Sequence, residues 1–205
     1  MFTGIITHFG EVKNRFEKDN QEYFVIKIIP NEKNESLISA LKLGSSIAVD
    51  GVCLTATDFE AETFSVQTMQ ETLKLTNLGS KKVGSKVNLE LPLTLNQGIE
   101  GHLVLGHVDG RGEVLVSERK EDGNWVLQIK PPIDLLKYIA YKGSITINGV
   151  SLTVSKQEAN FFEVSLIDYT LSNTDLGELE VGDFVNLEID MLARYLERLT
   201  SSPTP

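Results

Sequence analysis

The residues best suited to chemistry are those at which a duplicated sequence carries different reactive groups in its two copies. A thiol such as Cys53 can act as nucleophile or proton carrier, and an imidazole such as His107 exchanges protons near neutral pH. The unlike pairs are Cys53 with Ser151, His107 with Ile5, Lys142 with Gly44, and Asp190 with Pro92. Ser46 and Thr153 are shared, because Ser144 and Thr55 match them. This pattern predicts two similar pockets that are equipped differently.

Each reactive side chain also has a purely structural interpretation. Cys53 follows a turn in an apolar context, where inert buried cysteines are common. His107 and Asp190 could simply end strands, and Lys142 could be solvated. His8, His102 and His107 show no metal-ligand spacing with cysteine or carboxylates, so no metal site is predicted. No phosphate-binding or dinucleotide glycine motif is present.

The duplication itself is clearest around one hexapeptide. Residues 50–55, DGVCLT, return 98 positions later as NGVSLT at 148–153. The same offset aligns VNLE at 87–90 with VNLE at 185–188. Such ordered self-similarity predicts two homologous domains in tandem. We expect an N-terminal domain over 1–97, a C-terminal domain over 98–190, and a tail over 191–205.

Composition narrows the class of protein. The chain has 205 residues, of which 41% are hydrophobic and 23% are charged, as in ordinary globular proteins. A formal charge of −10 argues against nucleic acid and anionic membranes as partners. The single cysteine excludes an internal disulfide and fits a reducing compartment. With no signal peptide or long apolar run visible, the expected location is cytoplasmic.

Short strands with turn signals dominate both repeats. Asp50-Gly51 and Asn148-Gly149 are strong two-residue hairpin signals, because both positions tolerate positive φ. About six short strands per repeat, including one at the opening 2–6, predict an all-β fold of two six-stranded antiparallel Greek-key barrels. Residues 35–41 and 132–139 have helical spacing, so one short helix is expected in each repeat.

The C-terminus has no counterpart in the first repeat. Met191, Leu192, Tyr195, Leu196 and Leu199 fall on one face of a helix of about three turns. Such a stripe could dock on its own domain. Because it follows the last strand of a closed barrel, packing between subunits is the competing interpretation.

At this level of detail the sequence resembles a known family. The motifs that carry the resemblance are MFTGII at 1–6, GVCLT at 51–55, ETL at 71–73, TNLG at 76–79, GHL at 101–103, GHV at 106–108, YKG at 141–143 and GVSLTV at 149–154. In this order, and in both repeats, they closely resemble the α-chain type of riboflavin synthase. The resemblance covers residues 1 to about 200.

The resemblance implies a fold, an assembly and a reaction. It implies two Greek-key barrels, a C-terminal helix that gathers three subunits, and sites between the N-terminal barrel of one subunit and the C-terminal barrel of its neighbour. The implied reaction is the exchange of a four-carbon unit between two molecules of 6,7-dimethyl-8-ribityllumazine, which gives riboflavin and 5-amino-6-ribitylamino-uracil. No metal or cofactor is implied. Association with lumazine synthase is a further implied partnership.

The resemblance also assigns site residues. The implied catalytic groups are Cys53, Ser46, His107 and Asp190, supported by Ser151 and Thr153. The implied substrate segments in the first barrel are Gly4, Ile5 and Ile6; Cys53, Leu54 and Thr55; and Gln67, Thr68, Met69, Gln70, Glu71 and Thr72. Those in the second barrel are Gly106, His107 and Val108; Lys142; Ser151, Leu152 and Thr153; and Ser165, Leu166, Ile167, Asp168, Tyr169 and Thr170.

Two other functions compete with catalysis. A lumazine protein of luminous bacteria resembles this family but holds a chromophore without converting it, and it tends to lose the second-repeat motifs retained here. A tandem-barrel interaction module without a small ligand gives no reason for the unlike reactive pairs. Formation of riboflavin from the lumazine alone separates the three hypotheses.

Overall fold

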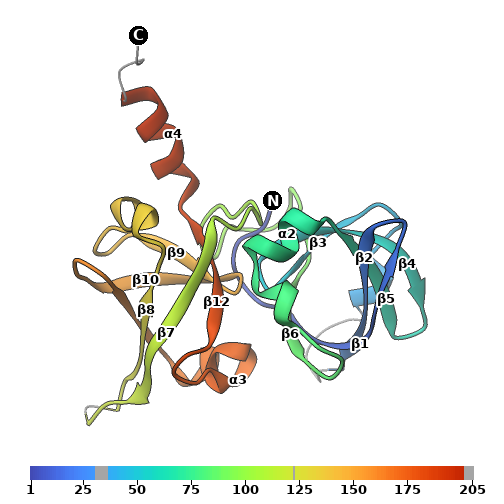
Figure 1. Cartoon of the computed structure of the whole chain (residues 1–205), viewed down its shortest axis with the longest axis horizontal. Coiled ribbons are helices and arrows are strands. Elements are labelled where there is room, and N and C mark those ends of the chain that lie inside the picture. Colours follow the sequence, from blue (N-terminus) through green and yellow to red (C-terminus); the bar gives the residue numbers. More distant parts are fainter. Residues whose placement is uncertain (31–36, 122, 201–205) are drawn as a thin grey trace.

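Two closed antiparallel barrels lie side by side in the computed structural model, and a C-terminal helix projects away from them (Figure 1). The structure describes residues 1–30, 37–121 and 123–200. In the first barrel the strand order around the circumference is β1-β2-β5-β4-β3-β6. The second barrel has the equivalent order, and each barrel closes without an open edge. The predicted fold of two six-stranded Greek-key barrels is therefore confirmed.

The first repeat contains six strands and three short helical segments. The strands are β1 (His8–Lys18), β2 (Gln21–Ile29), β3 (Ser46–Val49), β4 (Val52–Glu60), β5 (Thr63–Thr68) and β6 (Lys86–Glu90). The helical segments are α1 (Leu37–Ala40), α2 (Gln70–Leu75) and the 3-10 helix η1 (Asn77–Ser80).

The second repeat follows the same plan. Its strands are β7 (Gly110–Arg119), β8 (Trp125–Lys130), β9 (Ser144–Ile147), β10 (Val150–Gln157), β11 (Phe162–Leu166) and β12 (Phe184–Ile189). Its helical segments are the 3-10 helix η2 (Ile133–Tyr138), α3 (Asp168–Asn173) and the 3-10 helix η3 (Asp175–Glu178). Helix α4 (Met191–Thr200) completes the described chain.

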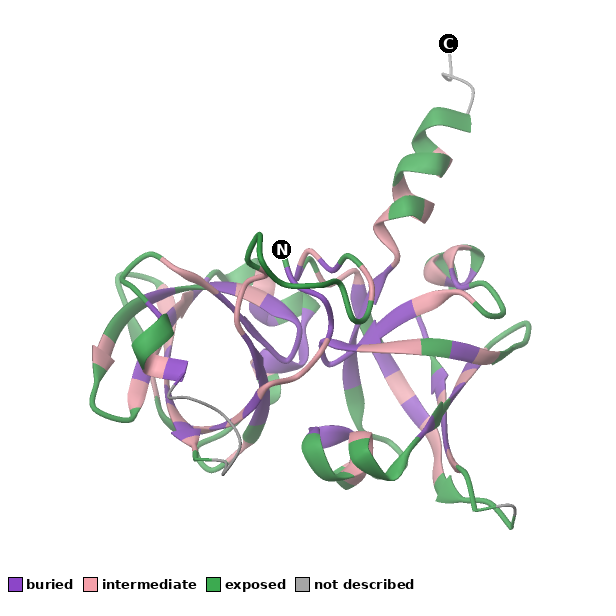
Figure 2. Cartoon of the chain, turned by 180° about the vertical axis from the view of Figure 1, so that it is seen from behind, coloured by how far each residue is buried: buried purple, intermediate pink, exposed green. Residues whose placement is uncertain are grey.

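Each barrel encloses its own apolar core. Along β5, buried residues alternate with half-buried ones, as expected for a strand with one face turned inward. Phe64 in the first barrel and its counterpart Phe162 in the second are fully buried. Figure 2 shows buried positions along the barrel strands, whereas α4 is mostly exposed. Each barrel therefore has its own apolar core, and helix α4 contributes to neither core.

Three local expectations were wrong. The opening 2–6 forms only one isolated bridge, from Phe2 to Val104, and the first strand begins at His8. Each repeat has more than one helical segment. The sequence did not predict α2 and α3, because they are too short to show a clear apolar period. The predicted helix at 132–139 is a 3-10 helix that begins after Pro132. Residues 35 and 36 of the predicted helix at 35–41 lie outside the described residues.

A buried polar cluster joins the barrels. It consists of Asp50, Asn77, Lys81, Asn88, Asn148, Asp175 and Asn186. The side-chain amide of Asn88 donates to the carbonyl of Asn148 at 3.0 Å, and the matched Asn186 donates to the carbonyl of Asp50 at 2.8 Å. These reciprocal hydrogen bonds link the last strand of each barrel to the hairpin turn of the other barrel. They fix the barrels relative to each other, since buried polar groups must keep their partners.

Candidate functional site

Cys53 lies in a pocket built from both repeats. The Asp50-Gly51 turn joins β3 to β4, and Cys53 is the second residue of β4, opposite Ala48. The cavity is about 230 Å³. It is lined by Val52, Cys53, Met69, Glu71, Thr72, Leu75, Thr76, Gly106, His107 and Val108. The structure therefore brings Cys53 and His107 together, as a shared site requires.

The opening segments of the repeats are exchanged between the barrels. The backbone N–H of Cys53 donates to the carbonyl of Gly106 at 2.9 Å, and that of Ser151 donates to the carbonyl of Gly4 at 2.8 Å. Val108 packs on the core of the first barrel and Ile6 on the core of the second.

This exchange corrects the assignment of substrate segments to barrels. Gly4, Ile5 and Ile6 belong with Ser151, and Gly106, His107 and Val108 belong with Cys53. The order along the sequence had placed each opening with its own repeat. The reason for the difference is that these segments pack as non-periodic loops, whose partners the sequence pattern does not specify.

The site around Ser151, called the second site below, contains a histidine that was not among the predicted site residues. The Nδ1 atom of His102 lies 2.7 Å from the hydroxyl oxygen of Ser151. Burial lowers the pKa of His102, and the nearby charge of Asp190 opposes that shift. A neutral ring can accept the hydroxyl proton of Ser151, so the pair can transfer a proton at neutral pH. The motif at 101–103 was the available signal, but nothing in its spacing linked it to Ser151.

Asp190 belongs to the second site, because its charge acts on His102. It precedes α4, and its carboxylate accepts the backbone N–H of Leu192 at 2.9 Å. Among the described residues, Asp190 does not line the Cys53 pocket. The shared residues occupy matched places: Ser46 faces Thr55 across β3 and β4, and their counterparts Ser144 and Thr153 face each other across β9 and β10.

Lys142 has an unusual backbone conformation. Its φ is +66°, in the left-handed region that favours glycine, and the first repeat has Gly44 there with φ +83°. The backbone N–H of Lys142 donates to Val154, next to Thr153. A lysine at such a position is a candidate for function, since backbone strain is often found at functional sites.

The remaining predicted substrate residues divide into wall and core positions. The segments 67–72 and 165–170 run from the ends of β5 and β11 into α2 and α3. The exposed members of these segments are Met69, Gln70, Glu71, Ser165, Ile167, Asp168 and Tyr169. The buried predicted residues are Leu54, Thr68 and Leu166, whose side chains face the protein interior. Leu152 packs partly on the core of the second barrel. The buried members can reach a ligand only through their backbone.

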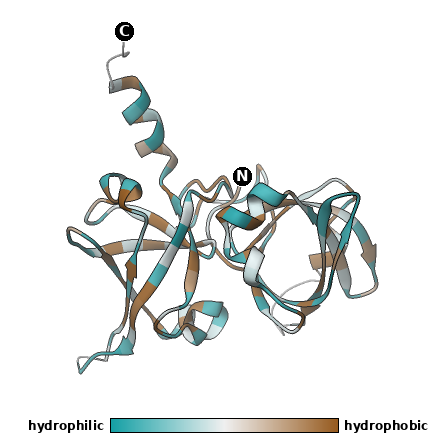
Figure 3. Cartoon of the chain, viewed as in Figure 1, coloured by the Kyte–Doolittle hydropathy of each residue, from teal (hydrophilic) through white to brown (hydrophobic). Residues whose placement is uncertain are grey.

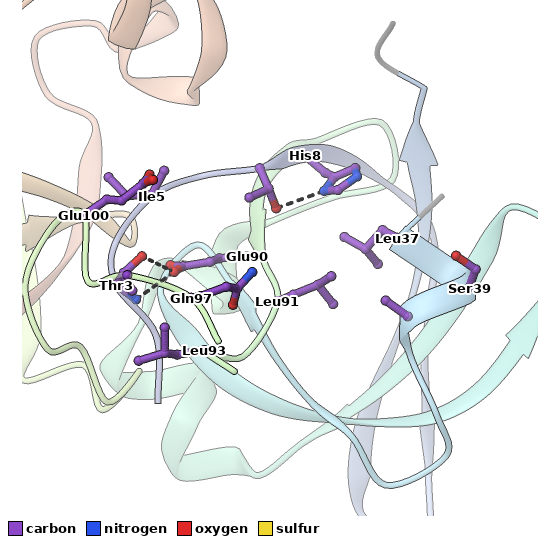
Figure 4. Close-up of a pocket in the computed structure, with 13 residues that line it drawn as sticks. Thr3, Ile5, His8, Leu37, Ser39, Glu90, Leu91, Leu93, Gln97 and Glu100 are labelled. Carbon is purple, nitrogen blue, oxygen red and sulfur yellow. Dashed lines mark hydrogen bonds between the residues drawn. The ribbon is translucent and has the colours of Figure 1, made fainter. Parts of the chain in front are cut away.

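A larger cavity of about 330 Å³ lies beside Glu90 (Figure 4). Of the predicted substrate residues it includes only Ile5. We therefore place the candidate chemistry around Cys53 and around Ser151, where the reactive groups converge.

Two kinds of site are absent from the described residues. No group of three or more histidine, cysteine or carboxylate side chains has the geometry to hold a metal ion. None of the described helices has the length and apolar character needed to cross a membrane.

Comparison with known proteins gives consistent results. A model of the lumazine binding domain matches residues 3–92 and 105–190. Riboflavin synthase of Brucella abortus is 43% identical over 97% of this chain and 98% of its own length. That of Actinobacillus pleuropneumoniae is 40% identical over 97% of this chain and 89% of its own length.

Solved structures agree with the sequence comparison. The crystal structure of LumP complexed with riboflavin matches with a TM-score of 0.82 and 25% identity, covering 93% of this chain and 100% of LumP. LumP complexed with 6,7-dimethyl-8-(1'-D-ribityl) lumazine matches with a TM-score of 0.80 and 26% identity, covering 93% and 99%. Since both repeats match the domain model and the relatives align over nearly their whole length, the chain belongs to the riboflavin synthase family of lumazine-binding proteins.

Proposed function

We propose that this protein catalyses the dismutation of two molecules of 6,7-dimethyl-8-ribityllumazine. One molecule donates a four-carbon unit and leaves as 5-amino-6-ribitylamino-uracil; the other accepts the unit and becomes riboflavin. The atoms of the two substrates equal those of the two products. The reaction therefore consumes no oxidant, reductant or net water, and the chain must supply only orientation and proton transfer.

One observation carries this proposal: the chain builds the same backbone site twice and equips each copy differently. In both copies a left-handed glycine, Gly106 or Gly4, places its carbonyl on the N–H of a reactive residue, Cys53 or Ser151. Two backbone sites of the same geometry are suited to binding two copies of one substrate. Unlike side chains suit the unlike fates of donor and acceptor.

The side chains suggest a division of roles. Cys53 is the candidate nucleophile or proton carrier of the first site, with His107 beside it in the same pocket. In the second site His102 and Ser151 form the candidate acid-base pair for a proton of the acidic 7-methyl group. Asp190 provides a negative charge near His102. Thr153 and Ser46 are candidate hydroxyl groups that support the reaction.

The assembly that we propose is a homotrimer held by α4. Leu192, Tyr195, Leu196 and Leu199 are each more than half exposed. In Figure 3 the helix carries hydrophobic and hydrophilic stretches side by side. An exposed apolar stripe on a helix clear of both cores is typical of a subunit contact. The complete site would then join the first barrel of one subunit to the second barrel of a neighbour. The cytoplasmic location and association with lumazine synthase remain predictions.

The decisive experiment is an assay of the purified chain with the lumazine as its only substrate, in the presence of a chelator. We expect riboflavin and 5-amino-6-ribitylamino-uracil in equal amounts. Loss of product on chelation, with recovery on adding zinc, would refute a metal-free reaction. Because LumP binds both lumazine and riboflavin, a binding-only function is the second candidate. Tight binding without product would favour it.

The assembly is tested separately by truncation after Asp190. The truncated protein should keep both barrels folded, because α4 lies outside both cores. It should elute as a monomer that binds lumazine without turnover. Unchanged mass and rate would contradict the proposed role of α4.

A further inference from the structure

Two buried glutamates hold matched positions near the ends of the last strands of the barrels. Glu90 in β6 and Glu188 in β12 are 4% and 2% exposed. Neither takes part in an ion pair with a described residue. A buried carboxylate without a cation needs strong hydrogen-bond donors, since burial penalises its charged form. Both glutamates find these donors in backbone N–H groups.

The donors come from the two opening segments. Glu188 accepts the successive N–H groups of Leu105, Gly106 and His107 at 2.8, 2.9 and 3.1 Å. Glu90 accepts those of Thr3 and Gly4 at 2.7 and 3.1 Å, together with the Thr3 hydroxyl at 3.0 Å.

Figure 4 shows Glu90 directed at Thr3. Successive N–H groups that converge on one anion form a concave nest, and here the anion is a side chain of the protein. Burial raises the pKa of both carboxyls, and the N–H donors act against that shift.

Each nest and its reactive residue are bonded to the two backbone polar groups of one glycine residue. The N–H of Gly106 points to Glu188, and the carbonyl of Gly106 accepts the N–H of Cys53. A methyl group added to Gly106 would lie 2.6 Å from the Cβ of Cys53, so the segment is packed closely on the site. The same relay runs from Glu90 through Gly4 to Ser151.

We propose that Glu188 and Glu90 are positioning residues, each of which fixes the opening segment that covers a site in the other barrel. Glu188, in the second barrel, holds Gly106 and His107 over Cys53 in the first. Glu90, in the first barrel, holds Gly4 against Ser151 in the second. This inference deepens the proposed function, on which its catalytic consequence rests. The positioning of the opening segments does not depend on the proposed function, because the reactivity of Cys53 measures it without any substrate.

The test compares Glu188→Gln with Glu90→Gln. Glutamine keeps the size of the side chain and one acceptor oxygen, but it removes the charge and turns an amide donor toward N–H donors. Cys53 is the only cysteine of the chain, so alkylation by iodoacetamide measures its site alone. The intact protein, with ligand absent, is alkylated at fixed pH, and the melting temperature of each variant is recorded.

Glu188→Gln should raise the alkylation rate of Cys53 about tenfold, because a weakened nest lets the covering segment open more often. Glu90→Gln should leave that rate within about twofold, although its effect on melting should be similar. Both variants should lose turnover, since the dismutation uses both sites. Glu188→Asp, which keeps the charge, should restore part of the protection and decides the matter if glutamine prevents folding.

Equal changes of Cys53 reactivity in the two variants, or no change in either, would overturn the positioning role. A wild-type protein that does not make riboflavin would refute the proposed function but leave this contrast intact. The two failures are therefore distinguishable.

Discussion

Gly51 and Gly149 pack against each other where the two barrels meet. A methyl group added to Gly51 would lie 2.6 Å from the backbone nitrogen of Gly149, and the converse contact would be 2.7 Å. Both residues also have φ near +80°, as their hairpin turns require. Both positions therefore need glycine, for the backbone conformation and for space. Cys53 and Ser151 each lie two residues after one of these glycines, so the contact helps to fix where the two reactive residues lie relative to each other.

This contact predicts that Gly149→Ala is destabilising. Alanine would strain the turn and clash with the Gly51 backbone, so the free energy of unfolding should fall by at least about 2 kcal/mol in urea titration. Gly182→Ala is the matched control, because φ there is +96° and the space around it is open. It should cost only about 1 kcal/mol. Equal losses would show that the close approach does not matter.

The pair of His102 and Ser151 leads to a prediction about protonation. Burial holds the pKa of His102 below its ordinary value of 6.5, while Asp190 raises it. Asp190→Asn should therefore lower the pKa of His102 further, as measured by NMR titration with His102→Gln used for assignment. In the wild type, the acid limb of kcat/KM should lie below pH 6.5. A pKa that rises in Asp190→Asn would contradict this arrangement.

Lys142→Gly should separate stability from function. Glycine relieves the left-handed strain at φ +66°, so we expect a gain of about 0.5–1 kcal/mol in the free energy of unfolding. If Lys142 contacts substrate, KM should rise at the same time. The reciprocal change, Gly44→Lys, should cost a similar amount, since the space beside Gly44 is open. A more stable variant with unaltered kinetics would assign Lys142 no part in the site.

Lys81 should stabilise the buried polar cluster. Its ammonium lies 2.6 Å from Asp50 and 3.9 Å from Asp175. Burial and the charge of Asp50 raise the pKa of Asp175 to about 7, and Lys81 opposes this. Lys81→Leu, which copies Leu179 of the second repeat, should cost about 3–5 kcal/mol near pH 8. The cost should shrink toward pH 5, because protonation removes the unpaired charge.

Adding Asp50→Asn, which copies Asn148, should recover much of that stability. The four proteins of this cycle are compared by urea unfolding at both pH values. Purely additive losses in the double variant would show that Lys81 and Asp50 are not coupled.

Cys53→Ser tests the chemistry of the first site. Thiol and hydroxyl differ little in size, so folding and lumazine affinity should stay nearly unchanged. A thiolate is far more accessible than an alkoxide, and turnover should fall about 10²-fold if Cys53 acts as nucleophile or proton carrier. Single-turnover formation of riboflavin is the measurement. A fall in turnover of only a few fold would show that Cys53 merely lines the pocket. His107, His102 and Ser151 would then be the remaining catalytic candidates.

Much of the fold followed from local patterns in the sequence. The 98-residue repeat predicted two domains, and alternation with Asp50-Gly51 and Asn148-Gly149 predicted the hairpins that the structure confirms. These features are local, since alternation and turn chemistry act over a few residues. The short helices α2 and α3 were missed because two turns hold too few apolar residues to reveal a period.

The sequence by itself determined the duplication, the strands, the hairpins and the residues at which the two copies differ. Only the tertiary structure decided which opening covers which site, that His102 meets Ser151 across 49 positions of sequence, and that Glu188 and Glu90 hold the openings from the opposite barrels. The physical reason is that these segments have no regular period. Their places are set by hydrogen bonds to distant backbone and carboxylate groups, which form only when both barrels have folded and met.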